Sequence, residues 1–166
     1  MVPQPLALEA LRQLGGAGWA GATRLMVIHP GAGGAAKRWP AEGFARTLEN
    51  LARSERFSLV IHEGPIDAGA VAAFLAHYRA PVIRLVEPPL PQLAGILSHA
   101  AVYVGNDSGI SHLAAAVGTQ SVVLFTAATL AWCPWAFNAR PVVVTTSEVE
   151  ATDVARVVAN VRRLLT

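Results

Sequence analysis

Two segments of the chain combine glycine, charge and short polar side chains in a way that suits anion binding. The first spans residues 29–40, HPGAGGAAKRWP, where glycines that include Gly33 and Gly34 are followed by Lys37 and Arg38. Glycines let backbone amides approach a phosphate closely, and the two cations neutralise its charge. The pattern favours a phosphate-binding loop, and a glycine-rich turn with a solvated Lys-Arg pair is the alternative.

The second segment, residues 104–118, passes through Asn106, Asp107 and Ser108 into an alanine-rich stretch. Any of these three side chains can cap a helix, whose free amides and positive dipole end would then hold a phosphate. His112 follows Ser108 by four positions, so the two share one helix face. The alternative is plain capping by Asp107, with a histidine packed in the core.

Two acids, Glu63 and Asp67, follow an apolar run at 57–61. An acid at that point of a nucleotide-binding fold often binds a ribose hydroxyl. Asp67 is equally able to cap the helix expected after it. We therefore expect a ribose contact from one of the two acids, with helix capping as the simpler role for Asp67.

Other site types receive little support. Cys133 is the only cysteine, which excludes a disulfide scaffold and a cysteine zinc site, and the histidines show no metal-ligand spacing. We expect no metal and no cofactor. Gly31, Gly33 and Ala36 match G-x-G-x-x-A, but Pro40 would fall inside the helix that this dinucleotide fingerprint needs. A nicotinamide oxidoreductase is therefore disfavoured.

Composition places the chain among folded proteins. Of its 166 residues, 53% are hydrophobic and 14% charged, which excludes a disordered chain. The formal charge of +2 is spread along the sequence without a basic tract, so nucleic acid is not an expected partner. No apolar run reaches the ~18 residues of a transmembrane segment, and the start MVPQPLALEA lacks the basic region of a signal peptide. We expect a cytoplasmic protein.

The elements that must position these segments alternate along the chain. Short runs that are apolar throughout, as in strands buried on both faces of a parallel sheet, lie at Leu25–Ile28, Phe57–Ile61, Val82–Val86, Ala101–Val104, Ser121–Phe125 and Pro141–Val144. Helical patterns lie between and after them, at Ala41–Arg53, Asp67–Tyr78, Pro91–Ser98, Ser108–Val117 and Ser147–Leu165. This order predicts an α/β fold, a Rossmann-like doubly wound parallel sheet of about six strands.

The ends of some helices are predicted by their residues. Gly118 is a candidate C-cap, and Ser147 with Glu150 forms a candidate capping box. The helix expected at residues 3–14 precedes the first strand and has no sheet partner in this scheme. We therefore divide the chain into a connector helix and linker at 1–20 and a domain at 21–166.

The segments 29–40 and 105–118 together resemble glycosyltransferase family 9, the bacterial lipopolysaccharide heptosyltransferases. GNDSGISHLAAAVG is similar to the family signature D-[ST]-G-x-x-H-x-A-A, and HPGAGGAAKRWP is similar to its preceding glycine loop. The resemblance covers residues 25–165. It implies one half of a GT-B architecture, the half that binds the nucleotide-sugar donor, with the first helix as the connector between halves.

Site roles follow from that resemblance residue by residue. Lys37 would contact the donor phosphates, with Gly33 and Gly34 in the same loop. Ser108 and Gly109 would offer a hydroxyl and amides to the pyrophosphate. The resemblance also implies that Asp107 holds sugar hydroxyls and that His112 supports the phosphate or its loop.

The implied function is transfer of a sugar, expected to be heptose, from a nucleoside diphosphate sugar to a lipopolysaccharide-type acceptor, without a metal. An ADP-sugar is the expected donor, and the inner face of the bacterial inner membrane the expected location. Residues 125–130, Phe-Thr-Ala-Ala-Thr-Leu, depart from the glycine- and proline-containing stretch usual there, which favours the alternative of a stand-alone nucleotide-binding module without turnover. The acceptor-binding N-terminal domain and the catalytic base have no counterpart in this sequence. We therefore expect an inactive isolated chain, and self-association through the cleft side of the sheet or through the helix at 3–14.

Overall fold

A computed structural model describes residues 2–165 of the chain. The elements in chain order are α1 (Gln4–Gly16), β1 (Arg24–His29), α2 (Ala41–Ala52), β2 (Phe57–Glu63), α3 (Ala68–His77), β3 (Ile83–Val86), α4 (Leu90–His99), β4 (Val102–Asn106), α5 (Gly109–Ala116), β5 (Ser121–Phe125), β6 (Ala139–Val143) and α6 (Ala151–Leu165). Short 3-10 turns lie at Ala35–Lys37 and Leu130–Trp132.

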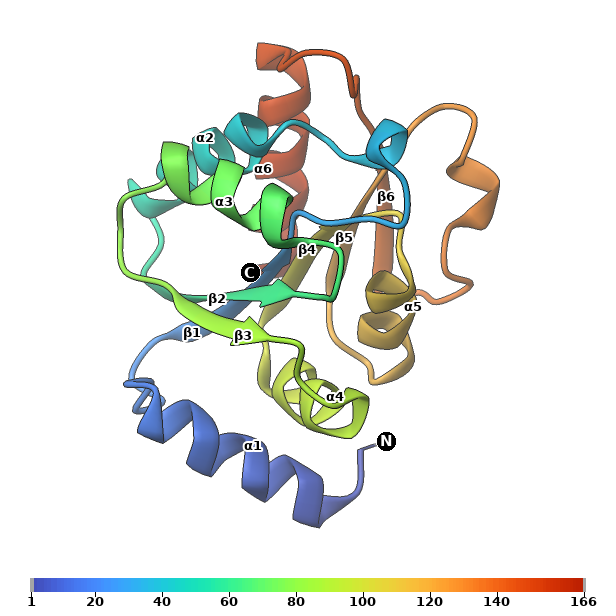
Figure 1. Cartoon of the computed structure of the whole chain (residues 1–166). Helices are drawn as coiled ribbons and strands as arrows, with labels where there is room; N and C mark the ends of the chain where they lie inside the picture. The colour runs from blue at the N-terminus through green and yellow to red at the C-terminus, as the bar shows by residue number, and fades with distance from the viewer. Residues whose placement is uncertain (1, 166) are drawn as a thin grey trace.

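The described strands form one parallel sheet in the order β3-β2-β1-β4-β5-β6. Figure 1 shows α2, α3 and α6 on one face of this sheet and α1, α4 and α5 on the other. The predicted α/β class, the doubly wound parallel topology and the strand number are confirmed. The chain leaves β1 toward one edge and returns at β4 toward the other, so the switch point lies between these two strands.

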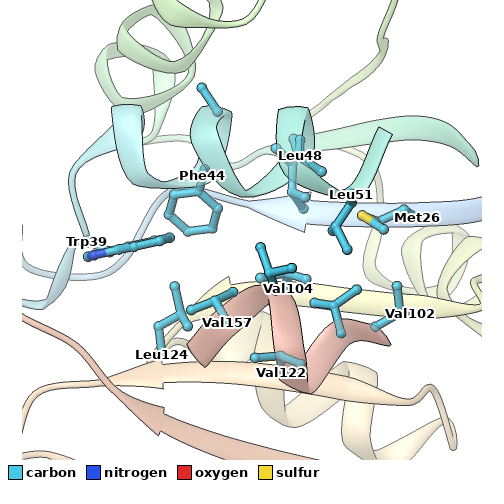
Figure 2. Close-up of a cluster of buried hydrophobic side chains, with 14 of the residues drawn as sticks. Met26, Trp39, Phe44, Leu48, Leu51, Val102, Val104, Val122, Leu124 and Val157 are labelled. Carbon is cyan, nitrogen blue, oxygen red and sulfur yellow. The ribbon is translucent and has the colours of Figure 1, made fainter. Parts of the chain in front are cut away.

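The core under α2 and α6 is built from large apolar side chains on both sides of the contact. Figure 2 shows Phe44, Leu48 and Leu51 of α2 pointing toward the sheet, where Val104 and neighbouring strand residues meet them. The spacing of the three α2 residues places them on one helix face. Trp39, which is 1% exposed, closes this core where the 29–40 loop enters α2.

The opposite face is covered by α4 and, outside it, by α1. Ala10 and Leu14 of α1 are buried in a cluster with Leu93 and Leu97 of α4. The helices approach closely at Gly95, where an added Cβ would lie 2.7 Å from the carbonyl oxygen of Leu6. The first helix thus packs on a helix layer and not on a strand, which agrees with its expected lack of a sheet partner.

The predicted start of the last helix is wrong. It begins at Ala151, and the expected capping box of Ser147 and Glu150 does not form. Instead, the Glu150 carboxylate accepts hydrogen bonds from the hydroxyls of Thr145 and Thr152. The C-cap prediction at Gly118 fits the structure, because that glycine has φ of 90°.

No helix within residues 2–165 is long and apolar enough to cross a lipid bilayer. Residue 1 of the expected connector segment (1–20) and residue 166 of the expected domain (21–166) lie outside the described part of the chain.

Candidate functional site

The two predicted segments meet at the carboxyl edge of the sheet. β1 and β4 are neighbours, with His29 opposite Gly105, so the loops that follow them are adjacent. Ligands of open α/β sheets bind at such a switch point. The topology therefore places the glycine loop beside the start of α5, as anion binding by both segments requires.

Asn106 joins the two segments. Its Nδ2 donates to the carbonyl oxygens of Pro30 and Gly31 at 2.9 and 3.3 Å, and its Oδ1 accepts from the Trp39 amide at 3.0 Å. The side chain is fully buried and satisfies backbone groups at both ends of the loop. Sequence reasoning offered Asn106 only as a helix cap, and the structure assigns it the anchoring of the glycine loop.

The glycines of this loop serve different purposes. An added Cβ at Gly31 would lie 2.0 Å from Asp67 Oδ1, so this position is a glycine because an internal carboxylate approaches it. At Gly33 and Gly34 no described atom lies within 4 Å of an added Cβ. Both positions therefore face open space, and a phosphate contact from either glycine stays a prediction.

Lys37 and Arg38 have separate roles. Lys37 Nζ donates to Asp107 Oδ2 at 2.7 Å, which pairs the predicted phosphate-binding cation with the predicted sugar-binding acid. Arg38 turns back onto the loop, and its guanidinium donates to the carbonyl oxygen of Ala32 at 2.9 Å. The structure therefore brings Lys37 to the site and uses Arg38 to hold the loop.

Within the described chain, no side chain caps the N-terminus of α5. Ser108 occupies the cap position, while the carboxylate of Asp107 faces Lys37. Gly109 does not have positive φ and, over residues 2–165, nothing lies within 4 Å of its added Cβ. His112 is exposed. The alternative of capping by Asp107 with a core histidine is therefore wrong, and the first amides of α5 stay available to an anion.

Two adjoining cavities surround these groups. One of about 350 Å³ is lined by Gly33, Lys37, Asp107, Ser108, Gly109, His112 and Trp132. The other, of about 450 Å³, shares Gly33, Ser108 and Gly109 with the first and extends over largely apolar side chains such as Ile66, Leu90 and Ile110. The structure thus brings together every predicted phosphate and sugar residue except Gly34, which lines neither cavity.

A buried hydrogen-bonded chain underlies the place where the cavities meet. Ser108 Oγ lies 3.2 Å from His29 Nδ1, and His29 Nε2 lies 3.0 Å from Asp67 Oδ2. His29 and Asp67 are 3% and 5% exposed. Sequence reasoning missed His29, although its place at the end of a central strand, directly before the glycine loop, was a signal for it.

Both expected ribose-binding acids have partners inside the protein. Glu63 accepts a hydrogen bond from Arg84 at 2.6 Å and does not line either cavity. Asp67 lines the larger cavity and accepts from the Gly64 amide and from His29. Its carboxylate does not cap α3, so the expected capping role is wrong. A ribose contact from either acid stays a prediction.

Among the described residues, one group could supply a trio of metal ligands. His29, His62 and Asp67 each offer an atom within 4.8 Å of the others. His29 and Asp67 are joined by a hydrogen bond of 3.0 Å, which needs no ion. A metal-free site stays a prediction.

Burial controls the protonation of this cluster. Desolvation, helped by the nearby His29, lowers the pKa of His62 from 6.5 to about 4, so this imidazole is neutral at pH 7. The hydrogen bond from His29 outweighs desolvation and lowers the pKa of Asp67, so that carboxyl group is ionised. Burial raises the pKa of Tyr103, which stays a neutral phenol.

The connection between β5 and β6 presents exposed aromatic side chains. Trp132 lines the smaller cavity, whereas Trp135 and Phe137 are fully exposed. At its start, Thr126 and Thr129 hydrogen-bond each other at 3.1 Å. Sequence reasoning left open whether Trp132 and Trp135 line a pocket or plug the sheet edge, and the structure gives the first role to Trp132 alone.

Comparison with protein-family models matches residues 7–159 to glycosyltransferase family 9 (heptosyltransferase). Two curated relatives are both named lipopolysaccharide heptosyltransferase 3. The one from Escherichia coli is 29% identical, and the one from E. coli strain K12 is 30% identical, each over 118 residues that cover 68% of this chain and 34% of the relative. The chain therefore spans about a third of the length of these relatives.

Solved structures share the fold. E. coli ADP-heptose LPS heptosyltransferase II aligns with a TM-score of 0.80 at 24% identity, covering 99% of this chain and 52% of that one. A family 9 glycosyltransferase from Veillonella parvula DSM 2008 gives 0.84 at 20% identity, covering 99% and 53%. E. coli heptosyltransferase WaaC with ADP gives 0.72 at 20% identity, covering 88% and 46%.

The chain thus corresponds to about half of each of these three solved chains. The family match extends over most of its length and includes both segments that form the site. On this evidence, the chain belongs to glycosyltransferase family 9, the heptosyltransferase family.

Proposed function

We propose that this chain is the donor-binding half of a glycosyltransferase that moves a heptose from an ADP-sugar to a lipopolysaccharide-type acceptor. The observation that carries the proposal is that Ser108 and Gly109 line both cavities where these meet, and that Lys37 lines the smaller cavity beside them. The larger, mostly apolar cavity suits a nucleoside. The smaller cavity, with Lys37, Asp107 and His112, suits a phosphorylated sugar. The curated relatives bear the name heptosyltransferase, and one structural neighbour was solved with ADP.

The chemistry expected of this site is displacement of the nucleoside diphosphate by an acceptor hydroxyl, with inversion at the sugar carbon. Negative charge develops on the leaving diphosphate during that step. Lys37 and the free amides at the start of α5 lie where they would stabilise it, without a metal. A second, N-terminal domain would bind the acceptor and supply the base that deprotonates it. We place the reaction in the cytoplasm at the inner membrane.

Calorimetric titration with ADP, UDP and GDP tests the donor assignment. ADP should bind, and Gly109→Val should weaken ADP binding while Gly69→Ala, a substitution on α3 where no described atom lies within 4 Å of the added methyl group, should not. Tighter binding of UDP or GDP than of ADP would contradict the adenine preference. Equal ADP affinity in Gly109→Val and wild type would show that ADP does not bind at the start of α5.

The alternative is a stand-alone nucleotide-binding module without turnover. The observation in its favour is the 126–130 segment, whose Thr126 and Thr129 hydroxyls are paired with each other. Transfer assays that mix the chain with a separately produced N-terminal half of a relative distinguish the two functions. Sugar transfer in the mixture, and none by the chain alone, would support the donor half; ADP-sugar binding without transfer would favour the module.

A further inference from the structure

Trp132 differs from the other residues around the smaller cavity. Those residues are small or polar: Gly33, Lys37, Asp107, Ser108, Gly109 and His112. Trp132 is 68% exposed, and among the described residues of this lining it is the one with a large apolar side chain. A cavity that combines charged groups with a single indole suits a ligand that is itself part polar and part apolar.

The backbone of Trp132 is held in place before any ligand arrives. Its amide donates to the carbonyl oxygen of Thr129 at 2.9 Å, within the short 3-10 turn. At the far end of the connection, Asn138 Nδ2 donates to the carbonyl oxygens of Ala115 and Thr119 at 3.1 and 2.8 Å, which joins the connection to α5. Because both ends are anchored, a ligand that meets Trp132 has less of the chain to order.

The diphosphate and the base of the donor are expected to bind other groups. Lys37 and the first amides of α5 supply the donors that phosphate oxygens need, whereas an indole carries no charge and a single N–H donor. The base is expected in the larger cavity, which Trp132 does not line. Of the parts of a nucleoside diphosphate sugar, the sugar is therefore the one left for Trp132.

A sugar ring matches both kinds of group in this cavity. Its hydroxyl groups project from the rim, and its C–H groups form two faces that are much less polar. An aromatic ring packs against such a face, while a carboxylate accepts hydrogen bonds from the hydroxyls. We propose that Trp132 is a binding residue for the transferred sugar, with its indole stacked on a C–H face of the ring and the Asp107 carboxylate accepting from the hydroxyl groups.

The charges around Trp132 narrow the class of sugar. The connection has no Asp, Glu, Lys or Arg at residues 126–139, and Lys37 is already paired with Asp107 at 2.7 Å. An acidic sugar would gain no cation from this connection and would be repelled by the Asp107 carboxylate. The sugar is therefore an uncharged one. This inference rests on the proposed function and deepens it, because it names the side chain that recognises the sugar.

Calorimetric titration with ADP and with ADP-heptose tests the assignment, because the sugar is what distinguishes the two ligands. For each protein, the dissociation constant of ADP is divided by that of ADP-heptose, and losses common to both ligands cancel in this ratio. Trp132→Ala should lower the ratio about three- to tenfold, as expected for one aromatic stacking contact, with little change in ADP affinity. Because Trp132 is mostly exposed, the variant should fold, which its melting temperature checks.

Two further variants serve as controls. Trp135→Ala removes an indole that is fully exposed and lines neither cavity, so its ratio should equal that of wild type. Trp132→Phe keeps an aromatic face and should retain most of the ratio. Tryptophan emission gives an independent readout: ADP-heptose should shift the wild-type emission to shorter wavelength more than ADP does, and this difference should be absent in Trp132→Phe.

The inference is overturned if Trp132→Ala has the wild-type ratio. It is likewise overturned if this variant weakens ADP and ADP-heptose equally, since the indole would then contact the nucleotide and not the sugar, or if Trp135→Ala lowers the ratio as much. A wild-type chain that binds neither ADP nor ADP-heptose would refute the proposed function and this inference with it. Binding of both ligands with an unchanged ratio in Trp132→Ala refutes the inference alone, so the two failures are distinguishable.

Discussion

At the scale of single residues, Lys37 and Arg38 are neighbours with opposite orientations. Lys37 pairs with Asp107 and lines the smaller cavity. Among the described lysines and arginines, Lys37 alone lines this cavity. Arg38 holds the carbonyl oxygens of Ala32 and Ile66. Two cations adjacent in sequence are therefore expected to differ in what their loss changes.

We predict that Lys37→Ala weakens ADP binding about tenfold or more, because a charge-assisted hydrogen bond contributes roughly 1.5 to 3 kcal/mol. Arg38→Ala should affect binding less and lower the melting temperature more, since it releases the loop. Calorimetry and thermal unfolding of the two variants measure both effects. Unchanged ADP affinity in Lys37→Ala would show that Lys37 pairs with Asp107 without contributing to nucleotide binding.

His62 makes stability depend on pH. Its pKa is about 4 in the folded chain and 6.5 in the ordinary case, so between these values the unfolded chain binds a proton that the folded chain does not. Acidification from pH 6.5 to 4 should therefore cost roughly 3 kcal/mol of folding free energy through this residue, at about 1.4 kcal/mol per unit. The lowered pKa of Asp67 adds a loss in the same direction, below its ordinary 3.8.

Urea unfolding across this pH range measures the effect. His62→Gln should flatten the profile between pH 6.5 and 4, whereas His77→Gln, at an exposed position of α3, should leave it as in wild type. An identical slope in His62→Gln and wild type would assign the acid sensitivity to other groups.

At the scale of elements, the start of α5 combines an uncapped helix end with a glycine that faces open space. Gly109 lines both cavities and does not need positive φ, so a larger side chain is compatible with the fold. Gly109→Val should therefore stay folded and lose ADP affinity by more than tenfold, because its methyl groups occupy the space that a phosphate needs. Ser108→Ala should lose less, since the backbone donors remain.

Thermal unfolding and calorimetry on the same preparations separate folding from binding in these two variants. If folded Gly109→Val binds ADP as wild type does, the amides at the start of α5 are not the phosphate site. A larger loss in Ser108→Ala than in Gly109→Val would indicate that the hydroxyl outweighs the backbone amides.

The contact between α1 and α4 depends on Gly95. An added methyl group there would lie 2.7 Å from a backbone oxygen of α1 and 3.0 Å from Ala10 Cβ. Gly95→Ala should destabilise the fold by about 1 to 3 kcal/mol, as overpacking does. Gly69→Ala, where no described atom lies near the added group, should instead stabilise slightly, by up to about 1 kcal/mol. Urea unfolding compares the two, and equal stabilities would mean that α1 can shift at no cost.

How far the sequence predicts these elements depends on where the determining contacts lie. β5 was predicted with its observed bounds because an apolar run buried on both faces is a local signal. The start of α6 was not, because Thr145 binds the carboxylates of both Glu150 and Asp153 and delays the helix.

The candidate site divides in the same way. Lys37, Asp107, Ser108 and Gly109 lie in local motifs and were predicted. His29 and Asp67 were not recognised as partners, because their contact depends on the pairing of β1 with β2, which local sequence does not encode.

At the scale of the whole molecule, the connection between β5 and β6 leaves Trp135 and Phe137 uncovered. Exposed apolar groups of this size often belong to an interface. We predict that the isolated chain self-associates through this connection, and that a Trp135→Ser, Phe137→Ser double variant shifts it toward monomer. Leu8→Ser, at the partly exposed face of α1, is the matched control for the alternative surface.

Light scattering over a range of protein concentrations measures this. A monomeric wild type at the highest concentration would contradict the prediction. If Leu8→Ser dissociates the oligomer and the double variant does not, the interface lies on α1.

The strand order has a consequence for how the chain folds. β1 pairs directly with β4, although β2 and β3 lie between them in the sequence, and the Lys37–Asp107 contact joins residues 70 positions apart. Closing such a long loop costs chain entropy before the contact is gained, which favours its late formation. The candidate site lies where β1 and β4 meet, so it forms only once the two halves of the sheet have joined. A ligand bound there should therefore slow the unfolding of the chain while leaving its folding rate nearly unchanged.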